Sequence, residues 1–193
     1  MSYKLQIIED LDAISAEELD EAISMLPKWR KEKALRFKFE QGRKECAFSY
    51  LLLCNMLADE FGLQEMPEFE YGEHDKPSIV GHPEIHFNLS HCKHAIACAV
   101  SREEIGIDVE CIGRDNDSLA RHVMSDEEYS QFISSSNPQE YFATLWTKKE
   151  ALVKLTGRGI DDDLKNLLSK YHNVSFHTEI HSDKKYVVTV ATK

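Results

Sequence analysis

A six-residue stretch, Ile105–Glu110, constrains the possible folds of this chain more than any other segment. Branched residues alternate in it with a glycine and two acids: Ile105, Ile107 and Val109 with Gly106, Asp108 and Glu110. This period of two predicts a β-strand with one apolar face and one acidic face. A bare polar strand face is the simpler interpretation. However, two like charges roughly 7 Å apart cost free energy unless a cation offsets them, which favours a site for a small hard cation.

A second motif predicts a helix that carries both charges and an aromatic anchor, Trp146-Thr-Lys-Lys149-Glu150-Ala-Leu-Val-Lys154. At about 100° per residue, its aromatic, acidic and basic residues share one broad side of the helix. Glu150 and Lys154 alone would be an ordinary i,i+4 pair worth roughly 0.2–0.5 kcal/mol. Together with the two acids of the strand, they favour a site for Mg²⁺ and a phosphate.

These two motifs resemble the signature of the Sfp-type 4′-phosphopantetheinyl transferases. Two further segments are similar to the family's glycine-lysine-proline and asparagine-x-serine-histidine segments: Gly72-x-x-x-Lys76-Pro77 and Phe87-Asn88-Leu-Ser90-His91-Cys92. The four elements occur in the family's order and extend over nearly half of the chain. On this resemblance the chain is identified as a member of the family.

The resemblance implies an α+β fold of two similar α/β lobes, related by a pseudo-twofold axis, with the active site between them. The N-terminal lobe would span residues 1–102 and the C-terminal lobe residues 103–193. The implied reaction transfers 4′-phosphopantetheine from coenzyme A to a serine of an apo acyl or peptidyl carrier protein. It would require Mg²⁺ and release adenosine 3′,5′-bisphosphate.

The resemblance also implies roles for individual residues. Mg²⁺ would be held by Asp108, Glu110 and Glu150, and Lys154 would neutralise a phosphate. The serine proton would pass to Glu150, or to Glu128 through a water, and the sequence leaves this choice open. In the local pattern Ser125-x-x-Glu128, Glu128 is better explained as the acid of a helix-capping box.

A basic cluster lies between Lys28 and Lys44, where eight lysines and arginines face only two acids. Such a run is usually a solvated helix face. The resemblance implies instead that it binds the phosphates of coenzyme A, with Lys33 as the leading candidate. The residues expected to contact coenzyme A are Arg30, Lys33, Arg43, Lys76, Ser90 and His91.

Composition narrows the remaining possibilities. The net charge of −11 argues against nucleic-acid binding. The apolar run near residues 50–54 is too short to cross a membrane. Five cysteines without a C-x-x-C pair predict reduced thiols, and we expect a cytoplasmic monomer. An acidic carrier protein would then dock on spare residues of the basic cluster and on exposed apolar residues near Met124.

Local patterns predict the other elements. Capping boxes at Ser15 and Ser125, and Asn137 before Pro138, predict helix starts. A long apolar helix is expected over residues 41–61, ending at Gly62. Strands are expected at residues 3–8, 69–71, 84–89, 95–100, 104–110, 174–180 and 186–191. The strands up to Glu110 would form a meander, with Ser90 in a turn.

Other hypotheses explain less of the sequence. Histidines 82, 86, 91 and 94 suggest zinc, but no helix would align them and no C-x-x-C completes a set. Ser90 beside His91 suggests a hydrolase, but G-x-S-x-G is absent. A metal-dependent phosphoesterase would not need the Asn88-x-Ser90-His91 segment. A non-catalytic coenzyme A binding module would not need the three acids.

Overall fold

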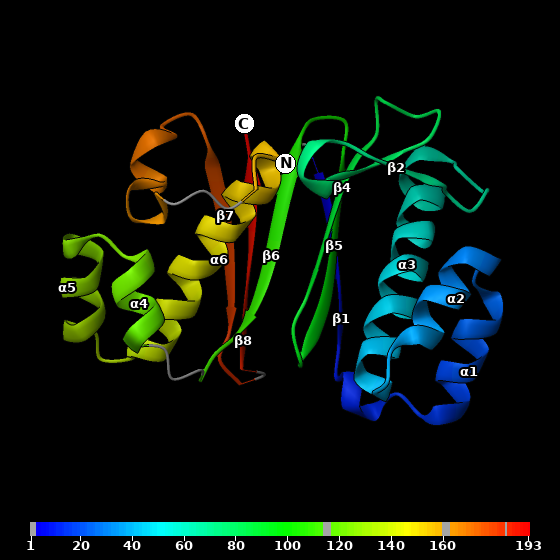
Figure 1. The fold of residues 1–193 in the computed structure, drawn as a ribbon, viewed down its shortest axis with the longest axis horizontal. Coiled ribbons are helices and arrows are strands. Elements are labelled where there is room, and N and C mark those ends of the chain that lie inside the picture. Colours follow the sequence, from blue (N-terminus) through cyan, green and yellow to red (C-terminus); the bar gives the residue numbers. More distant parts are fainter. Residues whose placement is uncertain (1–2, 114–116, 160–162, 184) are drawn as a thin grey trace.

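The computed structural model describes residues 3–113, 117–159, 163–183 and 185–193. Two sheets face each other in the middle of the molecule, with helices outside each (Figure 1). The first half contains β1 (Tyr3–Glu9), α1 (Ala16–Met25), α2 (Lys28–Arg36), α3 (Glu40–Phe61), β2 (Phe69–Tyr71), β3 (Pro77–Ile79), β4 (His86–His91) and β5 (Ala95–Ser101). The second contains β6 (Ile105–Cys111), α4 (Asp117–Val123), α5 (Asp126–Ser134), α6 (Pro138–Thr156), β7 (Ser175–His181) and β8 (Tyr186–Thr192). This mixture of helix and sheet confirms the α+β class.

Both three-stranded sheets have the same connectivity. In each, a strand is followed by helices and then by an antiparallel hairpin, whose last strand lies in the centre, in the orders β1-β5-β4 and β6-β8-β7. The predicted meander is therefore wrong at its first and last steps: among the strands that the structure describes, only its β4-β5 pair forms, while the strand at residues 69–71 pairs with β3. Because β5 already pairs with a strand on each side, β6 opens the second sheet. A separate β2-β3 ladder lies at one end of the first half.

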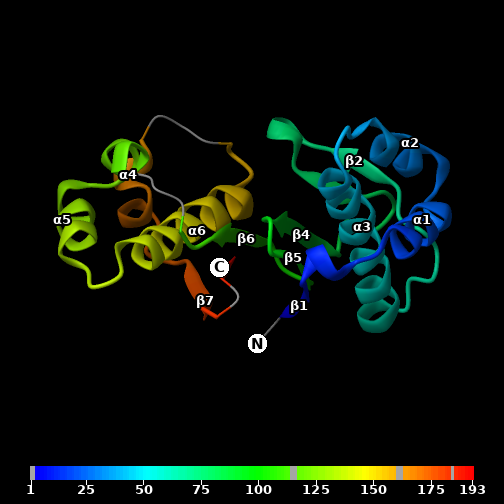
Figure 2. The ribbon, with the colours of Figure 1, turned by 90° about the horizontal axis from the view of Figure 1, so that it is seen from below.

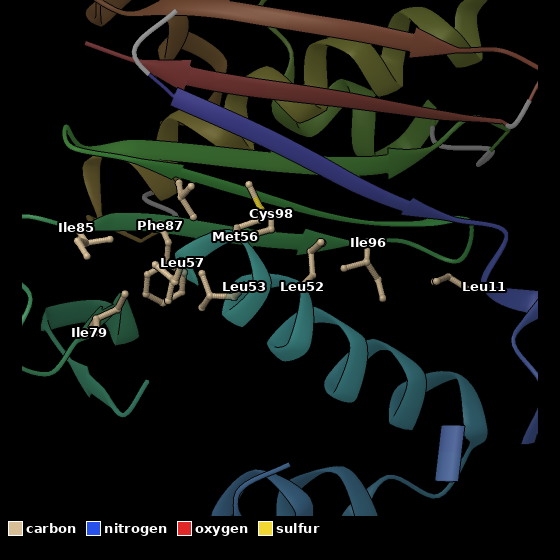
Figure 3. Close-up of a cluster of buried hydrophobic side chains, with 11 residues drawn as sticks. Leu11, Leu52, Leu53, Met56, Leu57, Ile79, Ile85, Phe87, Ile96 and Cys98 are labelled. Atoms are coloured by element: carbon tan, nitrogen blue, oxygen red, sulfur yellow. The ribbon is translucent and has the colours of Figure 1, made fainter. Parts of the chain in front are cut away.

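Alternation along β5 builds two cores at once. Ile96, Cys98 and Val100 pack on α3 in the first core. Figure 3 shows Leu53 and Met56 of α3 directed toward the strands of this sheet. The opposite face of β5 presents three alanines, Ala95, Ala97 and Ala99, to the second sheet. Their small size lets the two sheets approach closely, and each large apolar side chain buried nearby contributes about 1.5–3 kcal/mol.

Helix ends follow the predicted signals. Ser15 and Glu18 form one reciprocal capping box, and Ser125 and Glu128 form the other. The side chain of Asn137 caps α6. Left-handed glycines follow both long helices, at Gly62 after α3 and at Gly157 after α6. The second of these helices, α6, positions the candidate site.

Candidate active site

α6 crosses β6 at Gly106, and this crossing places the helical motif over the acidic strand. A Cβ atom added at Gly106 would lie 2.0 Å from the Ala151 carbonyl oxygen and 2.4 Å from the Leu155 nitrogen. Only glycine permits so close an approach of strand and helix backbones. Glu150 and Lys154, on the facing side of α6, are thereby brought to Asp108.

β4 and β6 lie side by side (Figure 2), and side-chain hydrogen bonds join them. The Ile107 N–H donates to Asn88 Oδ1 at 2.9 Å, and the Val109 N–H donates to Ser90 Oγ at 3.1 Å. Both partners advance by two residues, so the strands run parallel. We call this junction the seam. Ser90 lies within β4, so its predicted position in a turn is wrong: the turn begins at Cys92.

A hollow of about 400 Å³ opens at the seam. It contains Ser90, His91, Asp108, Glu110, Glu150 and Lys154, which the sequence assigned to the site, and also Leu89, Val109 and Trp146. The structure thus gathers all three predicted metal acids and the predicted phosphate lysine in one place. In the sequence, Asn88 was only part of a motif. In the structure it lies two residues before Ser90 on β4 and accepts one of the hydrogen bonds of the seam. Its spacing of two from Ser90 on a strand is the signal for that shared role.

Lys154 occupies the centre of the hollow. Its ammonium donates to Asp108 Oδ1 at 2.7 Å and to Ser90 Oγ at 3.0 Å. The Ser90 hydroxyl donates to the same Asp108 oxygen at 2.8 Å. Asp108 is only 7% exposed, so these charge-assisted bonds form largely out of water. Lys154 therefore pairs with the strand acid as well as lying one turn from Glu150.

Glu150 is partly buried and has two other carboxylates nearby. Burial raises the pKa of Glu150, and the carboxylates of Asp108 and Glu110 raise it further against the opposing effect of Lys154. Glu110 turns one oxygen back onto the Cys111 N–H, at 2.9 Å. The donor set consists of hard carboxylate oxygens, the ligands that Mg²⁺ prefers. Within the described ranges, no three acidic, histidine or cysteine side chains are already arranged to hold a metal.

Glu128 and Lys149 form a separate buried pair on the other side of α6. The Lys149 ammonium is fully buried and donates to Glu128 Oε2, the Val123 carbonyl and the Leu164 carbonyl at 2.7–2.8 Å. Burial lowers the pKa of Lys149, and its bond to Glu128 opposes this. The helical spacing predicted that Lys149 and Glu150 share one surface. This prediction is wrong, because Lys149 is buried against Glu128. Glu128 is outside the hollow's lining.

The residues predicted to bind coenzyme A fall into different environments. Lys33 is exposed on α2. The buried Arg30 guanidinium donates twice to the Cys46 carbonyl, at 2.9 and 3.2 Å. Arg43 donates to the Phe37 carbonyl at 3.0 Å. His91 is half-exposed at the hollow, with Nδ1 3.4 Å from Glu45.

Lys76 does not line the hollow that holds Asp108, Glu110 and Glu150. Its ammonium donates at 2.8 Å to the Leu155 carbonyl in the last turn of α6, where a cation is favoured by the helix dipole. Burial lowers the pKa of this lysine. It lines a second hollow of about 320 Å³ together with Gly157, His86 and Glu104. Lys76 thus links the two halves of the molecule.

No helix in the part of the chain that the structure describes combines the length and apolarity needed to cross a bilayer. The five cysteines are free thiols.

Comparison with known proteins gives a consistent result. The family model of the 4′-phosphopantetheinyl transferase superfamily matches residues 104–191. A 4′-phosphopantetheinyl transferase of Bacillus subtilis is 31% identical over 150 residues, covering 76% of this chain and 67% of the relative. The 4′-phosphopantetheinyl transferases ffp of Bacillus subtilis and Sfp of its strain 168 are 28% and 27% identical, each over 162 residues, 82% of this chain and 72% of the relative.

Proposed function

Since the chain belongs to the 4′-phosphopantetheinyl transferase superfamily, we propose that the hollow at the seam is where it transfers phosphopantetheine. The chain is a transferase that moves 4′-phosphopantetheine from coenzyme A to a serine of a carrier protein. The observation that carries the assignment of the site is the convergence of Lys154, Asp108 and Ser90 with Glu150 in one hollow.

Asp108, Glu110 and Glu150 would hold Mg²⁺. The raised pKa of Glu150 supports this assignment, because a cation would relieve the repulsion among the three carboxylates. When bound, the ion supplies neutralisation of charge on the pyrophosphate. Lys154 contributes a second positive charge and can exchange Asp108 for a phosphate oxygen, since its side chain is partly exposed.

Glu150 is the better candidate for accepting the serine proton. Its carboxylate lines the hollow, where a serine presented by the carrier protein would lie. Glu128 is engaged elsewhere: one of its oxygens accepts bonds from both Lys149 and the Ser125 amide. We therefore assign Glu128 to positioning α5 against α6, and proton acceptance to Glu150.

Coenzyme A phosphates would be bound by residues of the first half of the chain. Lys33 supplies an exposed cation from α2, and Ser90 and His91 supply donors at the hollow. Arg30 and Arg43 would contribute their remaining donors, since each already binds a carbonyl. The second hollow, with Lys76, would receive another part of the nucleotide.

The shared connectivity of the two sheets supports two lobes related by a pseudo-twofold axis, residues 1–102 and 103–193. The division falls in the short link between β5 and β6. The carrier protein would bind in its apo form to a monomer of this enzyme in the cytoplasm, with no nucleic acid or membrane involved.

Incubation with coenzyme A, Mg²⁺ and an apo carrier protein, followed by intact mass, tests the function. We expect the carrier to gain the mass of one phosphopantetheine group, and Lys154→Met to abolish the gain. The matched control is Glu127→Gln, an exposed acid outside the hollow. Hydrolysis of coenzyme A without modification of the carrier would instead favour a phosphoesterase.

A donor comparison tests the assignment of Lys33. Lys33→Ala should raise the KM for coenzyme A, and the defect should shrink with dephospho-coenzyme A, which lacks the 3′-phosphate. Lys31→Ala, another exposed lysine of α2, is the control. Equal defects with both donors would move Lys33 away from that phosphate.

A further inference from the structure

Two cysteines stand at the next step of the seam beyond the hydrogen bonds that join β4 and β6. Residues 88 and 90 bind the amides of residues 107 and 109. Continuing the same parallel register by two residues places Cys92 opposite Cys111. Cys92 directly follows β4, and Cys111 is the last residue of β6.

Both sulfurs gather on the same tight turn. The turn closes with the Cys92 N–H bonded to the Ala95 carbonyl at 2.9 Å. The Cys92 sulfur lies close to the backbone of His94 and Ala95, and the Cys111 sulfur lies close to the backbone of Lys93. The two thiols lie within hydrogen-bonding reach of each other. Both residues are partly exposed.

We propose that Cys92 and Cys111 form a dithiol modification site that reacts with low-molecular-weight disulfides and closes an intramolecular disulfide across the seam. Two thiols already in contact need only a small movement to reach the S–S bond length of about 2.05 Å. Their backbones are tied to one turn, which holds the sulfurs together while a reagent attacks.

The chemistry is two thiol–disulfide exchanges. One thiol loses its proton and attacks a sulfur of the reagent RSSR, forming a mixed disulfide and releasing RS⁻. The second thiol then loses its proton, attacks the protein sulfur of the mixed disulfide and releases the other RS⁻. The two cysteines are oxidised by two electrons, and RSSR is reduced to two RSH once the released protons are taken up.

The disulfide would act on the neighbouring site. Glu110 precedes Cys111 and is bonded to its amide, and His91 precedes Cys92. Drawing the sulfurs together shifts the Cys111 backbone and with it the carboxylate of Glu110. The oxidised enzyme should therefore need more Mg²⁺. This consequence rests on the proposed function, whereas formation of the bond does not.

Peptide mapping tests the bond itself. The full chain is treated with oxidised glutathione, quenched in acid, unfolded and alkylated with iodoacetamide. We expect Cys92 and Cys111 to escape alkylation and to appear as one linked peptide, and dithiothreitol to restore both. Cys92→Ser should stop at a glutathione adduct on Cys111. Cys54→Ser, which removes a partly exposed cysteine of α3, should leave the linked peptide unchanged. Full alkylation of both residues, or linkage to other cysteines, would overturn the site.

Two further measurements follow the oxidised protein. Its unfolding temperature should rise, because the bond closes a loop of about twenty residues. The Mg²⁺ concentration for half-maximal transfer should rise several-fold and return with dithiothreitol, with no such change in Cys92→Ser. A linked peptide with an unaltered Mg²⁺ requirement would refute the coupling to Glu110, while the transferase assignment would stand.

Discussion

At the scale of single residues, Glu150 shows how the site affects protonation. Its pKa is higher in the folded chain than the value of 4.5 for an ordinary glutamate, so ionisation is disfavoured by folding. Below the pKa that Glu150 has in the unfolded chain, the group is protonated in both states and does not lower the stability of the fold. As the pH rises through the higher pKa of the folded chain, the fold loses stability, because Glu150 must then ionise in a partly buried site. A cation bound as we propose would stabilise the ionised form of this acid.

Glu150→Gln should therefore raise the melting temperature at pH 7–8 in Mg²⁺-free buffer, because it removes the buried charge. The gain should fade as the pH is lowered toward 4.5, the ordinary value. Thermal scans of both proteins across this pH range are the measurement. Glu127→Gln serves as the exposed control, and a loss of stability in Glu150→Gln at pH 8 would contradict the assigned environment.

The Lys149–Glu128 pair makes a different case: the buried Lys149 ammonium has three hydrogen-bond acceptors, although burial still lowers its pKa. Lys149→Met would leave Glu128 and two carbonyls without their donor, and should cost about 3 kcal/mol, a fall in melting temperature of roughly 6–12 °C. Adding Glu128→Gln should recover part of this loss. Chemical denaturation of the two variants and the parent measures the coupling.

Which residues gather at the site was predictable where a motif fixes the faces of a strand or helix, and not where a partner is distant in sequence. Asp108, Glu110, Glu150 and Lys154 do meet, because strand and helix periodicities fix their faces. Helical spacing could not show that Lys149 turns toward Glu128, twenty-one positions away. That contact depends on how α5 packs on α6.

At the scale of elements, the close packing of α6 on β6 at Gly106 determines where the site residues of the two elements meet. Helix starts and ends were predictable because capping depends on residues within one turn. The step from β5 to β6 was not, since strand pairing is long-range: hydrophobic alternation predicts a strand without naming its neighbour. The site depends on this second kind of information.

Gly106→Ala should separate strand and helix and cost about 3 kcal/mol, because the new methyl would overlap helix backbone rather than a flexible side chain. Transfer activity should fall even at temperatures where the variant stays folded, since Glu150 and Lys154 move with α6. Gly72→Ala is the stability control, with nothing closer than 3.7 Å to the added Cβ. A Gly106→Ala protein as stable as the parent would mean that the crossing can relax.

At the scale of the whole molecule, the net negative charge opposes the approach of an acidic carrier protein. Overall repulsion follows from the net charge of −11, so docking needs a local patch. Met124 itself is only 1% exposed, so any apolar contribution there would come from its neighbours. Exposed apolar side chains instead accompany the basic cluster, at Leu35, Phe37 and Phe39.

We expect the KM for the carrier protein to depend weakly and non-monotonically on salt. Added salt screens both the local attraction and the overall repulsion over roughly 8–10 Å, while the apolar contacts are unaffected. Initial rates with an acidic apo carrier protein from low to moderate salt are the measurement. A steep, steady rise in KM would show that charge attraction by the basic cluster dominates docking.

Two backbone amides at the seam can report on how tightly the two halves of the molecule associate. In β6, the amide hydrogens of Ile107 and Val109 are held by side-chain oxygens of the opposite half rather than by a strand ladder. Their exchange with deuterated solvent therefore depends on how often the two halves part, whereas neighbouring amides report on the sheet itself. Slower exchange at these two positions on adding coenzyme A and Mg²⁺ would measure, amide by amide, how firmly substrate binds the halves together.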